Sequence, residues 1–288
     1  MIYKTLSNGV KMPMLGLGVY QMRDLQQCED IVATAIKHGY RLIDTAEVYF
    51  NEEAVGRGIK KSGVDRSELF ITTKVWFGGD CYDRTIKTVQ ESLEKLQTDY
   101  LDLVLIHSPS GDYYRSWQAL EDLYKKGIIK AIGVSNFAPA RLVDLCLNTE
   151  IRPMINQIEM HPFYQRTQDE LWDTKYGVAL ESWGSFVEGK NDVFNNPILV
   201  EIAEKHHKTV AQVILRWLLQ RDVVVIPKTV HENRLIENLN VFDFELDYED
   251  LISIATLDEN HTFFFNSQEP RAIERLFYFH HDLVTKKK

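Results

Sequence analysis

The sequence has few cysteines and no excess of basic residues. Its three cysteines, Cys28, Cys81 and Cys146, are odd in number and widely spaced among 288 residues. Such a pattern does not make a disulfide framework, so we expect reduced thiols and a cytoplasmic protein. The formal net charge is −9 at pH 7. Because no basic stripe is available to neutralise phosphates, we expect no nucleic-acid partner.

Long apolar runs and linker-like stretches are also missing. No apolar run approaches the roughly 20 residues that a membrane-spanning helix needs, and the N-terminus lacks the apolar segment of a signal peptide. We therefore expect no association with a membrane. No segment is rich in proline, glycine or serine, and the composition does not shift along the chain. The sequence thus predicts a single domain over residues 1–288.

Short apolar runs alternate with amphipathic segments through most of the chain. Strands are expected at 14–18, 41–44, 69–74, 101–107, 128–134, 154–158, 178–182 and 223–226. Helices are expected at 29–38, 83–96, 116–126, from Pro139, at 167–175 and at 231–239. The strands are almost continuously apolar, as parallel strands covered on both faces must be. This alternation predicts an α/β fold, a (β/α)₈ TIM barrel, with a doubly wound open sheet as the alternative.

Several segments lie outside the repeating unit. An Asn8-Gly9 pair between short runs predicts a β-hairpin over residues 3–13. After the seventh strand come an insertion at 184–196 and an extra helix that begins at Pro197, and after the eighth a second extra helix at 248–256. Residues 262–288 form a C-terminal tail, which we expect to close over the substrate pocket.

Reactive side chains follow the ends of several predicted strands. Asp44, Lys74, His107 and Lys228 each end an apolar run, and Tyr49 follows Asp44 by five residues. Because the carboxyl ends of barrel strands meet at one face, these side chains are expected to lie close together.

Asp44, Lys74, His107 and Tyr49 have side chains that together could form a proton-donating site. A lysine ammonium beside a tyrosine favours the phenolate and lowers the phenol pKa from its free value of about 10. A carboxylate such as Asp44 keeps the lysine charged and fixed in place. A histidine nearby can hydrogen-bond a substrate oxygen. The set predicts a general acid for an oxygen that becomes an alkoxide.

Three other motifs do not match the functional patterns that they partly resemble. Gly16 and Gly18 begin a dinucleotide fingerprint, but the third glycine position is Gln21, so a tight turn after the strand is the better interpretation. Gly133-Val-Ser135 resembles half a nucleophile elbow, but Phe137 replaces the closing glycine, which argues against a serine hydrolase. Two pairs of histidines, His206-His207 and His280-His281, are adjacent rather than four residues apart, so we expect no metal site.

From about residue 3 to residue 260 the sequence resembles the aldo-keto reductase family. The matching segments are Gly16-Leu-Gly18, Asp44-Thr-Ala, Tyr49 with Asn51-Glu52, Lys74, Leu105-Ile-His107, Gly133-Val-Ser-Asn-Phe137, Asn156-Gln157 with Glu159-Met-His-Pro162, Ile226-Pro-Lys-Thr229, Arg234, Glu237-Asn238 and Val241-Phe-Asp-Phe244. The resemblance implies NADPH-dependent reduction of aldehydes and ketones on a barrel fold, with NADH as a weaker cofactor. It also implies a monomer whose binding partner is a small carbonyl substrate.

The resemblance also implies roles for individual residues. Tyr49 is the general acid, Asp44 and Lys74 tune it, and His107 orients the carbonyl. The positions matching the cofactor site are Ser135, Asn136 and Gln157 for the nicotinamide carboxamide, Trp183 for stacking on the ring, Lys228, Thr229 and Arg234 for the adenosine 2′-phosphate, and Glu237 and Asn238 for adenine. Tyr20, Trp76 and Phe77 are expected in the substrate pocket. Ser108 and Ser182-Trp-Gly-Ser185 depart from the common family pattern, which leaves the substrate open.

Two rival functions remain at this point. A Schiff-base lyase could use a strand-end lysine such as Lys74 in a similar barrel, but it would need that lysine neutral, and Asp44 argues for a charged one. A regulatory subunit could bind NADPH without turnover, but the intact set of four reactive residues argues against it.

Overall fold

The computed structural model of the chain describes residues 2–78, 81–266 and 268–285, and it is a (β/α)₈ barrel. Eight parallel strands follow one another around the barrel in sequence order. They are β3 (Leu17–Gly18), β4 (Leu42–Asp44), β5 (Phe70–Val75), β6 (Leu103–Ile106), β7 (Ile132–Ser135), β8 (Ile155–Glu159), β9 (Ala179–Trp183) and β10 (Val224–Val225). A parallel bridge between Leu15 and Val225 joins the last strand to the first. The predicted barrel is confirmed.

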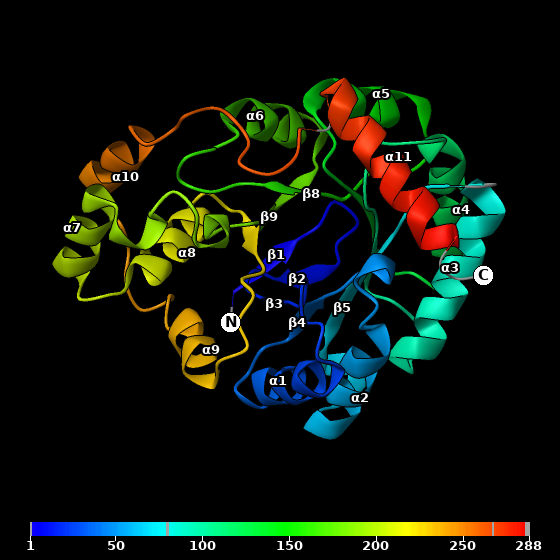
Figure 1. Cartoon of the computed structure of the whole chain (residues 1–288), viewed down its shortest axis with the longest axis horizontal. Helices are drawn as coiled ribbons and strands as arrows, with labels where there is room; N and C mark the ends of the chain where they lie inside the picture. The colour runs from blue at the N-terminus through cyan, green and yellow to red at the C-terminus, as the bar shows by residue number, and fades with distance from the viewer. Residues whose placement is uncertain (1, 79–80, 267, 286–288) are drawn as a thin grey trace.

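Helices surround the strands (Figure 1). They are α1 (Leu25–Lys37), α2 (Glu52–Ser62), α3 (Cys81–Leu96), α4 (Tyr113–Lys125), α5 (Pro139–Asn148), α6 (Thr167–Tyr176), α7 (Pro197–His206), α8 (Val210–Gln220), α9 (Glu232–Leu239), α10 (Tyr248–Ala255) and α11 (Pro270–Thr285). The extra helices expected from Pro197 and near 248–256 correspond to α7 and α10. The tail contains a helix, α11, for which the sequence analysis gave no bounds.

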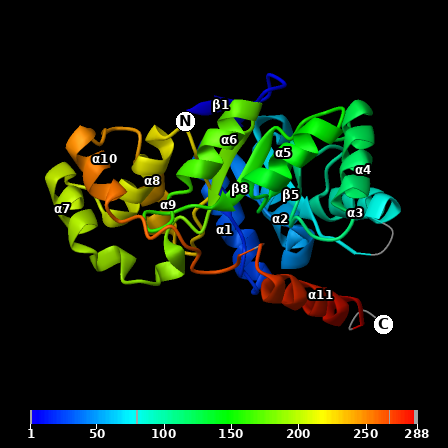
Figure 2. The ribbon, with the colours of Figure 1, turned by 90° about the horizontal axis from the view of Figure 1, so that it is seen from above.

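The predicted N-terminal hairpin is present. Strands β1 (Tyr3–Thr5) and β2 (Lys11–Pro13) pair antiparallel, and Gly9 takes a positive φ of 87° in the turn. The hairpin and α11 lie on opposite sides of the barrel (Figure 2). The N-terminal and C-terminal elements therefore lie at different sides of the barrel.

The glycines before the first helix are required by close packing. A Cβ on Gly16 would lie 2.4 Å from Leu42 Cγ, and a Cβ on Gly18 would lie 2.7 Å from the Ile226 carbonyl oxygen. Real Cβ atoms do not approach other atoms so closely. These glycines therefore let the first strand fit between its two neighbours, a different role from the tight turn expected from the sequence.

Two helices, α1 and α2, differ most from expectation. Helix α1 begins at Leu25, four residues before the expected start, because the Asp24 side chain accepts hydrogen bonds from the backbone N–H groups of Gln26 and Gln27. Helix α2 was not expected at all. It contains Gly56 and Gly58, and glycine in a helix interior costs about 1 kcal/mol relative to alanine, so the local pattern is weak there.

Candidate active site

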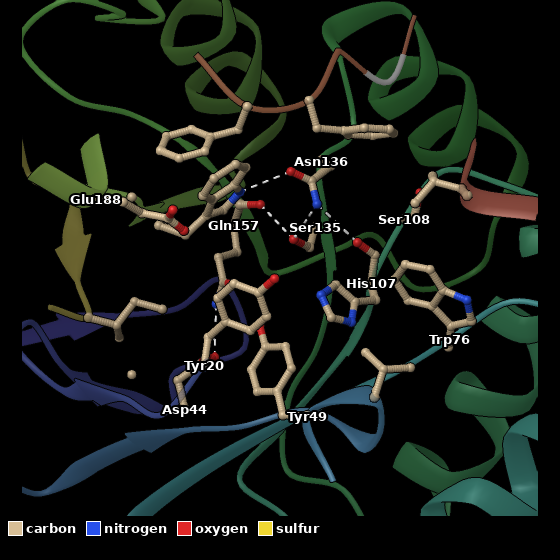
Figure 3. A pocket seen from close by; sticks show the side chains of 18 residues that line it. Tyr20, Asp44, Tyr49, Trp76, His107, Ser108, Ser135, Asn136, Gln157 and Glu188 are labelled. Atoms are coloured by element: carbon tan, nitrogen blue, oxygen red, sulfur yellow. Dashed lines mark hydrogen bonds between the residues drawn. The ribbon is translucent and has the colours of Figure 1, made fainter. Parts of the chain in front are cut away.

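The predicted catalytic residues meet at the carboxyl ends of the barrel strands. Asp44 is the last residue of β4, Lys74 lies near the end of β5, and His107 directly follows β6. Tyr49 ends a short 3₁₀ helix, Glu47–Tyr49, that follows β4. Figure 3 shows Asp44, Tyr49 and His107 around one cavity. Separation along the chain is therefore no obstacle to their acting together.

Lys74 contacts both the Asp44 carboxylate and the Tyr49 hydroxyl. Its Nζ lies 2.5 Å from Asp44 Oδ1, 2.9 Å from the Thr45 carbonyl oxygen and 3.4 Å from the Tyr49 hydroxyl. Burial has the largest single effect and lowers the pKa of Lys74, but the Asp44 carboxylate and the other acidic neighbours together raise it more, so the net direction is upward. The ammonium is therefore kept charged, as predicted from the sequence.

The pKa of Tyr49 differs from the expectation. Burial raises this pKa to about 12, and the Lys74 ammonium lowers it only in part. The net lowering predicted from the sequence is therefore wrong for the protein alone, because the loss of solvent around the phenol outweighs the lysine. The consequence is that Tyr49 stays protonated at neutral pH, which is the form that a proton donor needs.

His107 is a neutral hydrogen-bonding group. Burial and then the Lys74 charge hold the pKa of this histidine well below 6.5. Its ring packs edge-on against Tyr49 at 5.6 Å and Trp76 at 5.0 Å between ring centroids. A neutral imidazole has one N–H to donate and carries no charge that would compete with Lys74.

The three residues expected to hold a carboxamide form one wall of the cavity. The Ser135 hydroxyl donates to the backbone carbonyl oxygen of Gln157 at 2.8 Å. Asn136 Nδ2 donates to the backbone carbonyl oxygen of His107 at 3.0 Å. Asn136 takes a positive φ of 64°, which directs the chain away after β7. Trp183 Nε1 donates to Asn136 Oδ1 at 2.9 Å, so the indole ring is held beside this wall.

The residues expected around the adenosine phosphate lie past the end of β10. Ile226 lines the cavity, and Lys228 and Thr229 follow it, with Lys228 exposed and Thr229 buried. Arg234 is exposed on α9.

The two residues expected at adenine differ in burial. Asn238 is buried, whereas Glu237 is partly exposed and accepts a hydrogen bond from the Thr209 hydroxyl at 2.7 Å. The Glu237 side chain is therefore tied to the start of α8.

The cavity has a volume of about 350 Å³ and largely apolar walls. Tyr20 and Trp76 line it as predicted, whereas Phe77 does not. Phe77 instead stacks on Trp76 at 5.0 Å and contacts Phe277 of α11 at 4.8 Å between ring centroids. Its side chain therefore supports the wall from behind.

Sequence reasoning missed part of the wall. The added lining residues are Val48, Glu188, Phe264, Phe265 and Leu276. The last three belong to the tail, where the aromatic run at 263–265 was the available signal. Ser108, noted as a departure from the family pattern, also lines the cavity, and its hydroxyl lies 3.1 Å from that of Ser110.

Two kinds of feature are absent from the described residues. No group of three or more histidine, cysteine, aspartate or glutamate side chains could hold a metal ion among them. No helix in the described part of the chain is long and apolar enough to cross a membrane.

Comparisons with known proteins agree with this geometry. The chain is 52% identical over 258 residues to glyoxal reductase of Bacillus subtilis, covering 88% of this chain and 92% of the relative. It is 43% identical to methylglyoxal reductase DkgA of Escherichia coli K12, with 88% and 92% covered. A crystal structure of a Bombyx mori aldo-keto reductase in complex with NADP matches with a TM-score of 0.86 and 34% identity, covering 91% of this chain and 94% of that one.

A family model describes almost the whole barrel. The model for the aldo/keto reductase family matches residues 14–259, from the first barrel strand to just past α10. That range includes all four predicted catalytic residues and every residue assigned to the cofactor. The chain belongs to the aldo/keto reductase family and is an oxidoreductase.

Proposed function

We propose that this protein reduces small aldehydes and ketones with NADPH and that Tyr49 is the general acid. The observation that carries the proposal is the position of the Tyr49 hydroxyl, in the cavity and 3.4 Å from the buried ammonium of Lys74. Lys74 is in turn paired with Asp44 at 2.5 Å. A protonated phenol beside a fixed positive charge can release its proton when negative charge develops on a nearby oxygen.

Each residue of the site has a defined task in this mechanism. When bound, the reduced nicotinamide supplies the hydride that adds to the carbonyl carbon. Tyr49 donates its proton to the carbonyl oxygen, and Lys74 stabilises the phenolate that remains. His107, neutral because its pKa is low, donates a hydrogen bond that orients the same oxygen. The apolar walls from Trp76, Trp183 and the tail keep water from the reacting atoms.

The cavity wall has the donor and acceptor groups that a carboxamide requires. Ser135 and Asn136 offer a hydroxyl and an amide, and Gln157 offers a second amide. Trp183 adds a flat face beside them, and its Nε1 is already anchored on Asn136. We assign Lys228, Thr229 and Arg234 to the 2′-phosphate, because two cations and a hydroxyl suit a phosphate better than a ribose diol. NADH would then bind more weakly than NADPH.

The first substrates to test are small 2-oxoaldehydes. Relatives at 52% and 43% identity are named glyoxal reductase and methylglyoxal reductase. Substrate assays should follow NADPH absorbance across a panel of carbonyl compounds that includes both. No turnover on any member of the panel, with NADPH bound tightly, would favour a regulatory subunit instead.

Substitution of the phenol tests the mechanism. We expect Tyr49→Phe to lower kcat about 10²- to 10⁴-fold, the usual contribution of a general acid, and to leave the Kd for NADPH within about twofold. Tyr248→Phe is the matched control, because Tyr248 is 77% exposed on α10. An unchanged kcat in Tyr49→Phe would refute the assignment.

Trapping of a substrate adduct on Lys74 by borohydride would favour the Schiff-base lyase.

A further inference from the structure

One amide in the barrel interior donates to two carboxyl groups at once. Gln157 Nε2 lies 2.9 Å from Asp44 Oδ2 and 2.9 Å from Glu181 Oε2. Glu181 is fully buried, lies on β9, and does not line the cavity, whereas Gln157 lies on β8 and does line it. Their two strands are paired, and Gln157 and Glu181 are direct partners in the register.

This arrangement fixes which end of the amide is available to a ligand. An amide nitrogen has two N–H donors, and here both have an acceptor. Rotating the amide by half a turn would place its oxygen against Asp44 Oδ2, a carboxylate oxygen that can only accept, which is unfavourable. The Gln157 side-chain oxygen accepts no hydrogen bond from the described residues. It is therefore the polar atom that Gln157 can offer to the cavity.

We propose that Glu181 is a positioning residue that holds the Gln157 amide with its oxygen toward the cofactor, ready to accept a hydrogen bond from the carboxamide N–H group. The inference rests on the proposed function, since it assumes that a nicotinamide binds at this wall. Asp44 alone would satisfy one N–H of Gln157 and leave the second buried without a partner, at a cost of about 1–3 kcal/mol. The second acceptor thus makes one orientation dominant.

The charges around Glu181 explain how two carboxyl groups can share one amide. Those that act on it are Asp44 from β4 and Lys74 from β5. One ammonium cannot neutralise two buried carboxylates, and Lys74 is paired with Asp44. Burial, and then the charge of Asp44, raise the pKa of Glu181 to about 8. At neutral pH Glu181 is therefore protonated, and a neutral acid still presents an oxygen that accepts from Gln157.

The geometry around Glu181 agrees with a neutral acid. Its Oε1 is buried and has no hydrogen-bond partner among the described residues. An ionised carboxylate without such partners would be much more costly than a neutral one. Glutamine, which is neutral at every pH and has the same shape, should therefore replace Glu181 with little loss.

A cofactor analogue provides the test. The reduced 3-acetylpyridine analogue of NADPH has a methyl group in place of the carboxamide NH₂, so it has no N–H for the Gln157 oxygen. We expect the wild type to bind NADPH about tenfold more tightly than this analogue, the value of one good hydrogen bond. Glu181→Leu should bring the ratio of the two Kd values to within about twofold. Glu181→Gln should restore the wild-type ratio.

The outcomes separate this inference from the proposed function. An unchanged Kd ratio in Glu181→Leu, or no preference in the wild type, would overturn the role of Glu181 even if the enzyme reduces carbonyl compounds. Failure of the wild type to bind NADPH or to turn over would overturn the proposed function itself.

A second variant covers the case in which Glu181→Leu does not fold. Glu181→Met keeps an unbranched side chain of similar length but has no oxygen that could accept from Gln157 Nε2, so it should also bring the ratio of the two Kd values to within about twofold. A wild-type ratio in Glu181→Met would contradict the inference.

Discussion

Tyr49 is subject to two opposing effects, and their balance determines what it can do. Removal of water raises the pKa of the phenol, whereas the ammonium of Lys74 at 3.4 Å lowers it. Burial is the larger effect, so the phenol is protonated at neutral pH. In the proposed mechanism the lysine acts mainly when the proton leaves, because its attraction is stronger for the phenolate than for the neutral phenol. Under that proposal the site stabilises the transition state more than the resting enzyme.

Lys228 allows a second test at the scale of one side chain. We expect Lys228→Ala to raise the Kd for NADPH about tenfold and to leave that for NADH within about twofold, because only NADPH has the 2′-phosphate that a lysine can pair with. Fluorescence titration with both cofactors measures the two constants.

Lys87→Ala is the control for the loss of a lysine and should leave both constants unchanged. Lys87 is exposed on α3, its Nζ is 3.7 Å from Glu91, and neither residue lines the cavity. Equal losses of affinity for NADPH and NADH in Lys228→Ala would show that Lys228 does not bind the 2′-phosphate.

Single residues could be predicted where they end a strand. Asp44, Lys74 and His107 each follow an apolar run, so their types and places were visible in the sequence. Glu181 lies inside such a run, between Leu180 and Ser182. A glutamate within a fully buried strand was a signal, but its meaning depends on Gln157 and Asp44, which are distant in the chain. Long-range hydrogen bonds of this kind cannot be derived from local pattern.

At the scale of elements, α2 shows how packing can override local preference. It is wedged between α1 and α3: a Cβ on Gly58 would lie 2.7 Å from the Glu29 carbonyl oxygen, and a Cβ on Gly56 would lie 2.5 Å from that of Lys95. The glycines weaken the helix as an isolated segment but allow its backbone to approach its neighbours. The sequence pattern records the weakness and gives no direct sign of the approach, which is why this helix was not predicted.

A methyl group on α2 tests this account. Gly58→Ala should lower the free energy of unfolding by about 1–3 kcal/mol, the usual cost of overpacking, although alanine favours helix. Urea unfolding followed by circular dichroism measures the change. Lys60→Ala is the control on the same helix, because Lys60 is exposed, and it should change stability by less than about 0.5 kcal/mol. A stabilised Gly58→Ala variant would show that the backbone has room to move.

At the scale of the whole molecule, the two ends of the chain have different relations to the site. The hairpin lies on the side of the barrel away from α11, and the tail supplies Phe264, Phe265 and Leu276 to the cavity. The start of the tail is tied to the barrel, because the backbone N–H of Phe263 and the hydroxyl of Thr262 both donate to Glu159 at the end of β8. The barrel could be predicted from the repeating pattern, and the tail was expected to close over the pocket, where its three residues now line the cavity. The detailed path of the tail and the bounds of α11 could not be predicted, because the tail follows no such repeat.

Helix α11 contributes to the wall of the cavity with little burial of its own. Among its residues whose side chains are described, Ala272 is buried, while Phe277 and Tyr278 are 45% and 74% exposed. It contacts the wall through Phe277 on Phe77 and lines the cavity through Leu276. These contacts favour a role in binding the substrate over a role in holding the barrel together.

Removal of α11 separates these two roles. A chain ending at Asn266 should unfold within a few degrees of the full-length protein and bind NADPH equally well. Its KM for an apolar aromatic aldehyde should rise about ten- to hundredfold, because burial of a leucine-sized contact is worth about 1.5–3 kcal/mol. Tyr278→Ala, which removes an exposed ring from the same helix, should leave KM unchanged. If the shortened chain keeps its KM but melts far earlier, then α11 stabilises the barrel, and the substrate is held by the remaining walls.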